Sequence, residues 1–394
     1  MQTKHYYIYS HFDFTQGSAG TTRMLYYAQA IADQNNKVYL ISCCTDRLSI
    51  KSFIEISPNI FVLKDKKLTK NPFQVFKFVR RLRDFANRQV GKQVFLHYPF
   101  PLISLELISL CYLKLIKRES LYTELNEIRK HTSHFHSKVS IRKPKYSLKK
   151  IVFKTIFTFM EPLISIYDGV VCISSSIETY AKKFNKNSLR VPILTNPYMV
   201  FEKSNKKYAT NGVINIGFSG SIHPTKENLE NFIDIIKKLK EQGLPISFNL
   251  CGSIFNDYKE RFESIYKLRE EISYFGNLDS KQFSSFLSQQ DILVLPRGFS
   301  LQNKYGFSTK LSDYLNHKKI TIVTDISDNG LYIKDGINGF IVPPDNDFEM
   351  YKKLKFVIEN LNILYKKVIP NAIKTSREHF YYLNYSEPLR QFLH

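Results

Sequence analysis

Lys226, Lys310 and Asp313 are the side chains of this sequence whose types and spacing are best suited to chemistry. Lys310 and Asp313 stand three residues apart in a helical pattern, so they share one helix face. A cation beside a carboxylate suits a ligand with phosphate at one end and hydroxyls at the other. An ordinary surface ion pair is the alternative. Lys226 follows a strand-like run, at the expected start of a helix at Glu227, where free N–H groups favour an anion. An ordinary solvated lysine is the alternative there.

Lys310 and Asp313 are expected to be positioned by the stretch from Asp291 to Pro344. Its pattern is an apolar strand (291–296), a polar loop (297–308), a short helix (309–315) and a second apolar strand (320–324). Strand, loop, helix and strand form the repeating unit of a doubly wound parallel sheet. Such sheets bind ligands at the carboxyl ends of their strands, so we expect a ligand site in the loop that leaves the first strand.

The first half of the chain opens with a similar pattern. A strand over 5–10, a loop containing Gly17 and Gly20, a helix and a second strand form a βαβ unit. The loop lacks GxGxxG spacing, so a flexible turn is as good an interpretation as a nucleotide-binding loop. His97 lies near the end of a later strand, and Glu124 follows another strand-like stretch. Because ligands bind at strand ends in such folds, we take both as candidate ligand-contacting or catalytic residues; satisfied buried polar groups are the alternative.

Length and composition indicate two domains of an α/β protein. The chain has 394 residues, 43% of them hydrophobic and 23% charged, which is ordinary for a globular protein. Its five cysteines include no CxxC pair, so neither a disulfide framework nor a zinc site is expected. The N-terminus lacks the apolar core of a signal peptide, and no uncharged apolar run is long enough to span a membrane.

The net charge of +22 is concentrated in the first half. Residues 1–200 hold 31 Lys and Arg against 13 Asp and Glu, a net +18, which leaves +4 for the rest. The basic segments 71–93 and 138–159 interleave these charges with aromatic and aliphatic residues, which is typical of an anionic membrane surface. A packed amphipathic helix for the first and a disordered basic loop for the second are the alternatives. A nucleic-acid partner also fits the charge, but no nucleic-acid-binding motif is present, so none is expected.

Several of these features together resemble a known enzyme family. Pro296, the run from Tyr305 to Leu315, the strand ending at Thr324 and the Asp335–Gly339 turn resemble the donor-binding core of retaining glycosyltransferases of the GT-B fold, group 1 (family 4). That family usually carries two glutamates eight residues apart. Asp313 matches the second of them, and Tyr305 stands in place of the first.

The resemblance implies roles for particular residues. Lys226 and Lys310 would neutralise the diphosphate of a nucleotide-sugar donor, while Ser221 occupies the place of a usual arginine that Arg297 would replace. Asp313 would hold the ribose hydroxyls, and backbone groups at 276–278 would meet the nucleobase. The candidate catalytic residues are Lys226, Lys310, His97 and Glu124; the candidate donor-binding residues are Gly220, Ser221, Arg297, Asn277, Leu278, Ser308, Thr309, Asp313, Gly17 and Gly20.

The sequence thus predicts a GT-B protein, two Rossmann-like domains facing a cleft. The expected parts are an acceptor-binding domain over 1–203, a donor-binding domain over 211–364 and a helix over 365–394 that returns to the first domain. We expect a cytoplasmic, metal-independent hexosyltransferase without a cofactor, peripheral on the inner membrane face. It would move sugar from a nucleotide-sugar to a hydroxyl of a saccharide or lipid-linked acceptor in bacterial surface polysaccharide synthesis. An epimerase or phosphorylase, a catalytically degenerate relative and a basic nucleic-acid-binding protein are the alternatives.

Overall fold

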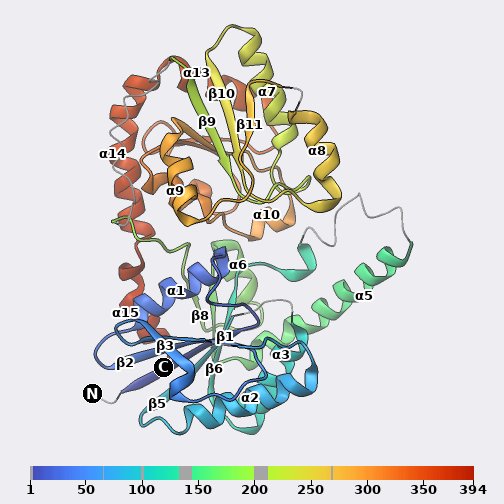
Figure 1. The fold of residues 1–394 in the computed structure, drawn as a ribbon, viewed down its shortest axis with the longest axis vertical. Helices are drawn as coiled ribbons and strands as arrows, with labels where there is room; N and C mark the ends of the chain where they lie inside the picture. Colours follow the sequence, from blue (N-terminus) through green and yellow to red (C-terminus); the bar gives the residue numbers. More distant parts are fainter. Residues whose placement is uncertain (1–2, 65, 99–101, 133–143, 199–211, 268) are drawn as a thin grey trace. The chain divides into compact units, whose positions relative to one another are not determined.

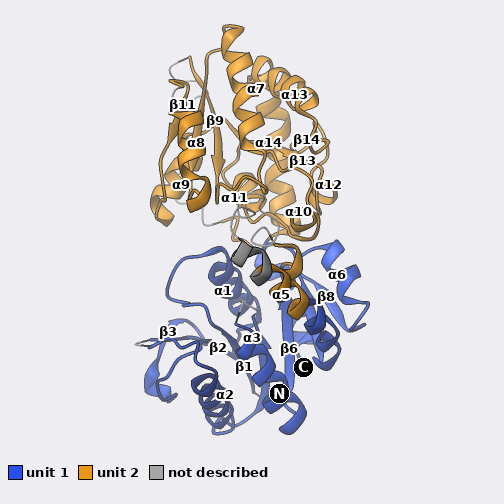
Figure 2. Ribbon diagram, turned by 90° about the vertical axis from the view of Figure 1, so that its right-hand side faces the viewer, with its two compact units in different colours: residues 1–126, 158–194, 381–394 blue, residues 127–157, 195–380 orange. Residues whose placement is uncertain are grey.

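The computed structural model describes residues 3–64, 66–98, 102–132, 144–198, 212–267 and 269–394. The chain divides into two compact units, each an α/β layer structure around its own sheet (Figure 2). Unit 1 comprises residues 1–126, 158–194 and 381–394, and unit 2 comprises residues 127–157 and 195–380. The C-terminal 14 residues therefore belong to the same unit as the N-terminus, whereas the long helix before them, Leu361–His379, belongs to unit 2.

Unit 1 is built on an eight-stranded sheet in the order β3-β4-β2-β1-β5-β6-β7-β8 (Figure 1). Neighbouring strands are parallel except for the β3–β4 hairpin, which the sequence analysis did not anticipate. The central strands are buried on both faces, as parallel strands covered by helices require. The strands are β1 Lys4–Ser10, β2 Asn36–Ser42, β3 Phe53–Ser57, β4 Ile60–Leu63, β5 Lys92–His97, β6 Ser120–Leu125, β7 Gly169–Cys172 and β8 Ser188–Arg190.

One helix of unit 1 is shorter than the basic segment 71–93 that contains it. It ends at Ala86 with Asn87 as its C-cap, Gly91 takes φ +134°, and Lys92 already begins β5. A second helix begins at Ile103 as an α-helix and continues as a π-helix from Leu110. The helices are α1 Ala19–Ile31, η1 Ile50–Ser52, α2 Pro72–Ala86, α3 Ile103–Ser109, η2 Leu110–Ile116, η5 Glu161–Ile166, α6 Ser175–Ala181, η7 Tyr382–Tyr385 and α15 Ser386–Phe392.

Unit 2 is built on a six-stranded, wholly parallel sheet in the order β11-β10-β9-β12-β13-β14. Numbered within the unit, this is the order 3-2-1-4-5-6 of a doubly wound sheet. The order reverses between β9 and β12, and ligands of such sheets bind outside the carboxyl ends of the strands at that point. The strands are β9 Ile214–Ser219, β10 Ile246–Cys251, β11 Ile272–Tyr274, β12 Ile292–Leu295, β13 Ile320–Thr324 and β14 Phe340–Val342.

The helices of unit 2 cover both faces of its sheet (Figure 1). We expected a loop over the whole stretch 297–308, but this stretch contains the short helix α10. Residues 138–143 of the second basic segment lie outside the described residues, and α5 follows them. The helices are η3 Arg129–His131, α5 Pro144–Met160, α7 Leu229–Glu241, η6 Asn256–Tyr258, α8 Lys259–Tyr266, α9 Ser280–Gln289, α10 Leu301–Tyr305, α11 Lys310–Asn316, α12 Asn329–Tyr332, α13 Asp347–Glu359 and α14 Leu361–His379. Among the described residues, none of the helices has the length and hydropathy of a membrane-spanning segment.

Candidate functional site

Three glycines line the carboxyl ends of neighbouring strands in unit 2. Gly220, Gly252 and Gly276 follow β9, β10 and β11, and their φ angles are +132°, +118° and +67°. Gly220 donates to Cys251 across 2.8 Å, and Gly252 donates to Gly276 across 2.7 Å, so the three turns are joined by backbone hydrogen bonds. A Cβ on Gly252 would lie 2.2 Å from the carbonyl oxygen of Gly220. The strand ends therefore present bare backbone, to which a ligand can approach closely.

Gly220 also makes room for Lys310. A Cβ built on Gly220 would lie 1.8 Å from Cε and 2.3 Å from Nζ of Lys310. The lysine side chain, from the first turn of α11, thus runs across the face of the glycine. Its ammonium also lies 5.1 Å from the ring centroid of Phe218, a cation–π arrangement.

Hydrogen bonds hold the loops after β9 and β12 together. Glu227 and Arg297 form an isolated antiparallel bridge, and Asn228 donates to the carbonyl of Pro296 across 2.7 Å. The buried Asn303 amide donates to the carbonyls of Lys226 (2.6 Å) and Gly298 (2.9 Å). We expected Lys226 at the start of a helix, but α7 begins at Leu229, and Lys226 lies in the loop before it. The hydrogen bonds between the two loops fix the directions of their side chains.

A buried carboxylate lies among three cations at this point. Glu227 is fully buried, and its Oε1 is 3.1 Å from Nζ of Lys310 and 3.4 Å from Nη2 of Arg297. The side chains of Lys310 and Arg297 are 12% and 6% exposed, and Lys226 is half-buried next to the carboxylate. We call Glu227 with Lys226, Arg297 and Lys310 the cation cluster. Three cations against one carboxylate leave an excess of positive charge at the strand ends, which an anionic ligand can neutralise.

The cluster strongly perturbs the protonation of its members. Burial alone would raise the pKa of Glu227, but the charges of Lys310, Arg297 and Lys226 lower it to about 2. Burial lowers the pKa of Lys310 to about 8, with the other two cations adding to the effect and Glu227 opposing it. Burial likewise lowers the pKa of Lys226. Perturbed cations beside exposed backbone are typical of a binding or catalytic site.

Asp313 lies one turn along α11 from Lys310. Burial raises the pKa of its carboxyl to about 7, and Lys310 opposes that shift only in part. The side chain makes no hydrogen bond or ion pair with the residues that the structure describes. A carboxylate with raised pKa and open hydrogen-bonding capacity is suited to hold ligand hydroxyls.

Tyr305, which stands in place of the first family glutamate, stacks on an imidazole. Its ring lies 5.8 Å from that of His131 with an interplanar angle of 7°, and both residues belong to unit 2. The same segment brings Glu127 close enough to raise the pKa of Lys226 against the effect of burial. An aromatic face thus occupies a position where the family has a carboxylate.

The remaining donor-side candidates of unit 2 lie around the glycine turns and α11. Asn277 and Leu278 directly follow Gly276, whereas Ser221 is exposed and makes no contact with the cation cluster. Thr309 is the N-cap residue of α11, and the buried Ser308 hydroxyl before it has no hydrogen-bond partner among the described residues. The structure thus brings Lys226, Arg297 and Lys310 together around a carboxylate that the sequence analysis missed.

Glu227 escaped notice because it reads as an ordinary acidic residue in a first helical turn. Its partners Arg297 and Lys310 are 70 and 83 residues away in the sequence. A local signal in the sequence is that Glu227 directly follows Lys226, in the loop after β9 and Gly220.

Of the four candidates in unit 1, His97 and Glu124 lie at strand ends and Gly17 in the first loop, whereas Gly20 lies in the first turn of α1 and not in that loop as expected. Glu124 is fully buried in an ion pair with Arg23, whose guanidinium also donates to Tyr27 and to the carbonyls of Val191 and Pro192. This arrangement favours a structural ion pair, and we leave Glu124 out of the site. His97 is 1% exposed and lies 5.3 Å from the Tyr9 ring; its acceptor-side role stays a prediction.

Gly17 and Gly20 flank the start of α1. Ser18, between them, caps the helix in a capping box with Thr21. A Cβ on Gly20 would lie 2.8 Å from the Tyr98 hydroxyl, so packing already requires that glycine. The donor-binding role expected for both stays a prediction.

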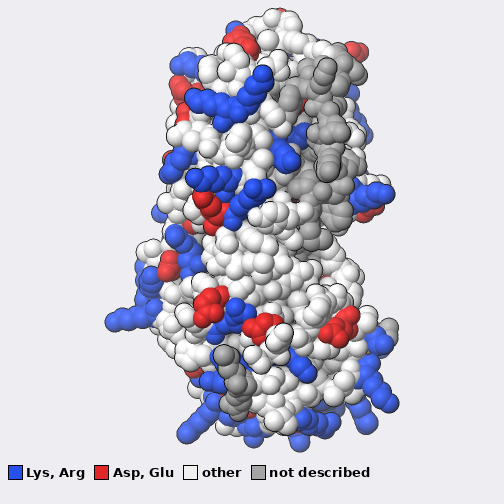
Figure 3. Space-filling model, turned by 90° about the vertical axis from the view of Figure 1, so that its left-hand side faces the viewer, with Lys and Arg blue, Asp and Glu red and all other residues white. Residues whose placement is uncertain are grey.

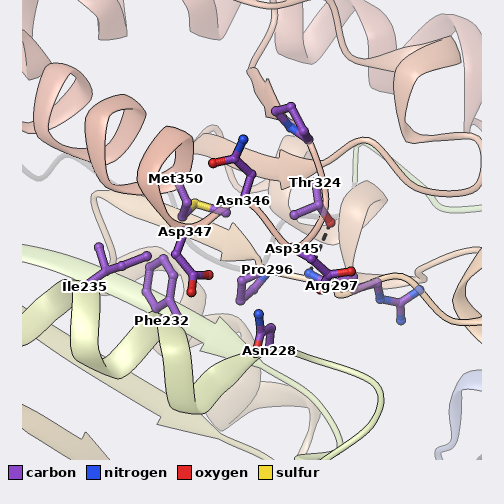
Figure 4. A pocket seen from close by; sticks show the side chains of 11 residues that line it. Asn228, Phe232, Ile235, Pro296, Arg297, Thr324, Asp345, Asn346, Asp347 and Met350 are labelled. Atoms are coloured by element: carbon purple, nitrogen blue, oxygen red, sulfur yellow. Dashed lines mark hydrogen bonds between the residues drawn. The ribbon is translucent and has the colours of Figure 1, made fainter.

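A shallow hollow lies on the other side of Arg297, between α7 and α13 (Figure 4). The Arg297 backbone lines it and donates to Thr324, while the guanidinium contacts Glu227. Asp345 accepts from Phe299, Asp347 accepts from Asn231, and Asn346 caps α13, so the Asp-Asn-Asp run serves a turn and a helix cap. Carboxylates would repel phosphate, and we do not place the anion site there. The hollow is lined by Asn228, Phe232, Ile235, Pro296, Arg297, Thr324, Pro343, Asp345, Asn346, Asp347 and Met350.

Comparison with known proteins supports the fold described above. Residues 200–375 match the family model of "Glycosyl transferases group 1". No curated protein matches the sequence. Among solved structures, sucrose-phosphate synthase from Thermosynechococcus elongatus aligns with a TM-score of 0.71 at 12% identity, covering 99% of this chain and 98% of that one. A glycosyltransferase from Rickettsia africae gives 0.69 at 16%, covering 100% and 99%. Anabaena HepE in complex with UDP-glucose gives 0.66 at 12%, covering 99% of both. The expected GT-B fold is thus confirmed.

Proposed function

We propose that this protein transfers a sugar from a nucleotide-sugar to a hydroxyl acceptor. The chain has the GT-B fold, and its residues 200–375 match the model of the group 1 glycosyl transferases. The observation that carries the proposal is the cation cluster at the topological switch point of unit 2, beside three bare glycine turns. Excess positive charge next to exposed backbone suits a diphosphate. The UDP-glucose complex of the similar HepE protein supports a nucleotide-sugar as the ligand class.

In the proposed reaction the bond between the anomeric carbon and the diphosphate oxygen breaks, and the acceptor oxygen bonds to that carbon. The nucleoside diphosphate leaves with the bonding electrons, and its released oxygen takes up the proton that the acceptor hydroxyl loses. Negative charge therefore grows on the diphosphate in the transition state, where fixed cations are most effective. We assign this stabilisation to Lys226, Lys310 and Arg297, without a metal ion. Asp313 would accept hydrogen bonds from the ribose hydroxyls.

Retention of the anomeric configuration belongs to the proposal through the family resemblance. The product of a transfer assay tests it directly, because the proton spectrum of the new linkage distinguishes the two anomers. An inverted anomer would remove retention from the proposal and leave transfer itself standing.

We further propose that the acceptor is lipid-linked and that unit 1 meets it at an anionic, inner membrane surface during bacterial surface polysaccharide synthesis. The support is a face on which α2 packs against α3 and η2, with the rings of Phe76 and Tyr112 5.6 Å apart. We call its exposed apolar residues the α2–η2 face: Phe73, Phe76, Leu107, Leu115 and Ile116.

Basic side chains surround the α2–η2 face. Lys77 lies over the Phe73 ring at 4.4 Å and Lys117 over Tyr112 at 5.7 Å, while Arg80 and Arg118 are exposed. Not every basic residue of α2 is available: Arg81 donates to the carbonyls of Thr45 and Cys44, and Arg83 pairs with Glu119. Figure 3 shows Lys and Arg side chains that project from unit 1, in the lower part of the view. Exposed apolar groups ringed by cations are typical of an interfacial surface.

A panel of nucleotide-sugars, scored by the shift in melting temperature, is the first test. We expect one nucleotide class to stabilise the protein, and Lys226→Ala to abolish turnover while the melting temperature without ligand stays within a few degrees. Near wild-type turnover in that variant would show that the phosphate site is misassigned. If none of the nucleotide-sugars binds and an oligonucleotide does, the transferase proposal falls to the nucleic-acid alternative.

A further inference from the structure

Glu227 has no place in the proposed chemistry, and yet it occupies the centre of the phosphate site. It is fully buried, Lys310 and Arg297 both contact its Oε1, and its Oε2 has no hydrogen-bond partner among the residues that the structure describes. A fixed carboxylate in a site for an anion repels the ligand, so its presence calls for a function. A purely structural ion pair would need one cation; this carboxylate has three around it.

Lys310 depends on Glu227 more than the other cations do. It comes from α11, crosses Gly220 and ends at Glu227, and its side chain is 12% exposed. Arginine and lysine differ in this respect: a buried lysine shifts its pKa readily, whereas a guanidinium does not lose its proton in proteins. The charged and titratable groups facing Lys310 are Lys226 and Glu227 from the loop after β9, Arg297 from the loop after β12, Cys251 from β10 and Asp313 on its own helix.

Glu227 is the main group among these that favours the ammonium form of Lys310. The two other cations and burial all favour the neutral amine, and Asp313, with its own raised pKa, is only partly ionised near neutral pH. Glu227 itself stays ionised throughout the physiological range, since the cations around it lower its pKa to about 2. Its charge is therefore constant, while that of Lys310 is not.

Building on the proposed function, we propose that Glu227 is a positioning residue that keeps Lys310 protonated and extended across Gly220, ready for the diphosphate of the donor. When the diphosphate enters, it takes over as counter-ion, and the Lys310 ammonium hydrogen-bonds to phosphate. When the nucleoside diphosphate leaves, Glu227 receives the ammonium again. The Glu227 carboxylate is thus the counter-ion of Lys310 whenever no diphosphate is bound.

The test is the pH dependence of nucleotide-sugar binding in wild type, Glu227→Gln and Glu227→Asp. UDP-glucose and GDP-mannose are suitable probes, because their phosphates are diesters and carry no proton that titrates between pH 5 and about 10. For the wild type we expect affinity to fall as the pH rises through about 8, where Lys310 loses its proton. In Glu227→Gln the midpoint of this loss should move down by about 1–3 pH units, the usual effect of losing an adjacent opposite charge.

The shape of the curve separates this role from simple repulsion or simple stability. Removing the carboxylate also removes one repulsive charge, but that effect is the same at every pH in the range because Glu227 is always ionised. A structural role would lower the melting temperature without moving the midpoint. Lys310→Arg in the Glu227→Gln background should restore affinity at alkaline pH, since a guanidinium stays charged.

Each result decides the matter. A lower midpoint in Glu227→Gln, with a smaller shift in Glu227→Asp, supports the proposal; if Glu227→Gln does not fold, the shift in Glu227→Asp alone carries the test. An unchanged midpoint in the variants, with wild type binding normally, overturns this role of Glu227 and leaves the transferase proposal intact. Failure of the wild type to bind these probes and every other nucleotide-sugar of the panel, at any pH, would instead overturn the proposed function, and the role of Glu227 with it.

Discussion

Replacing Gly220 by alanine tests whether the site is built as described. The added methyl would lie 1.8 Å from Cε of Lys310, closer than any real contact, so the lysine must move away from the strand end. The backbone cannot yield easily, because Gly252 packs against Gly220 and the turn is hydrogen-bonded to Cys251. The φ angle of +132° is itself a conformation that alanine avoids.

Two effects of different size are expected. Backbone strain of this kind costs about 1–3 kcal/mol of the free energy of unfolding. Displacement of Lys310 removes one charge-assisted hydrogen bond to phosphate, worth about 1.5–3 kcal/mol, which corresponds to a Kd about 10- to 100-fold higher. Gly243→Ala is a matched control. That glycine has φ +80° in the turn after α7, with nothing within 4 Å of an added Cβ, so it brings strain without displacing any side chain.

The assay is isothermal titration calorimetry with the nucleoside diphosphate of the nucleotide-sugar that gives the largest thermal shift in the panel. Thermal unfolding of each variant is measured alongside it. We expect both alanine variants to be destabilised but only Gly220→Ala to bind weakly. In the double variant Gly220→Ala, Lys310→Ala, the loss of affinity should be little larger than for Lys310→Ala alone, because both changes act through the same ammonium. Binding by Gly220→Ala within twofold of wild type, or fully additive losses in the double variant, would refute the reasoning.

Three further predictions follow from the protonation states and the surface. Burial lowers the pKa of Lys310 to about 8, so a diphosphate that binds its ammonium form should take up protons at about pH 8.5; equal heats in buffers of different ionisation enthalpy would contradict this. Burial raises the pKa of Asp313 to about 7 from 3.8, so stability from its neutral form is lost as the pH rises through 7. Asp313→Asn should therefore raise the melting temperature at pH 8 but not near pH 4, while it weakens binding of a ribonucleotide more than of its 2′-deoxy form; an unchanged preference would exclude contact with the ribose hydroxyls. On the α2–η2 face, Phe73→Ser with Ile116→Ser should abolish pelleting with anionic vesicles, and Lys77→Glu should weaken it at least about fivefold, since each basic residue contributes about 1 kcal/mol. Wild-type pelleting by both variants would show that the membrane contact lies elsewhere.

The fold could be predicted from the sequence because its signals are local. Apolar runs such as 292–295 and 320–324, separated by amphipathic helices, indicate a parallel sheet regardless of what lies elsewhere in the chain. Lys310 and Asp313 could be found for the same reason, as neighbours on one helical turn. The helix α2 was expected to be too long because its basic pattern continues after Ala86, although Gly91 marks its limit.

The contacts that decide the role of each charge are not local, and the sequence does not specify them. Glu124 looked accessible at a strand end, but Arg23, 101 residues earlier, covers it with a buried ion pair. Glu227 looked like part of a helix start, but cations 70 and 83 residues later surround it. In both cases the chain fold, and not the neighbouring residues, supplies the partner. Periodicity thus identifies elements, whereas roles of buried charges need the tertiary structure.

The most direct test is a crystal structure with the nucleoside diphosphate that gives the largest thermal shift. We expect its phosphates within hydrogen-bonding distance of Lys310 and Lys226 beside Gly220, with Lys310 turned from Glu227 toward phosphate and the ribose near Asp313. Phosphates bound elsewhere, such as in the hollow lined by Asp345 and Asp347, would contradict the central claim that the cation cluster is the diphosphate site.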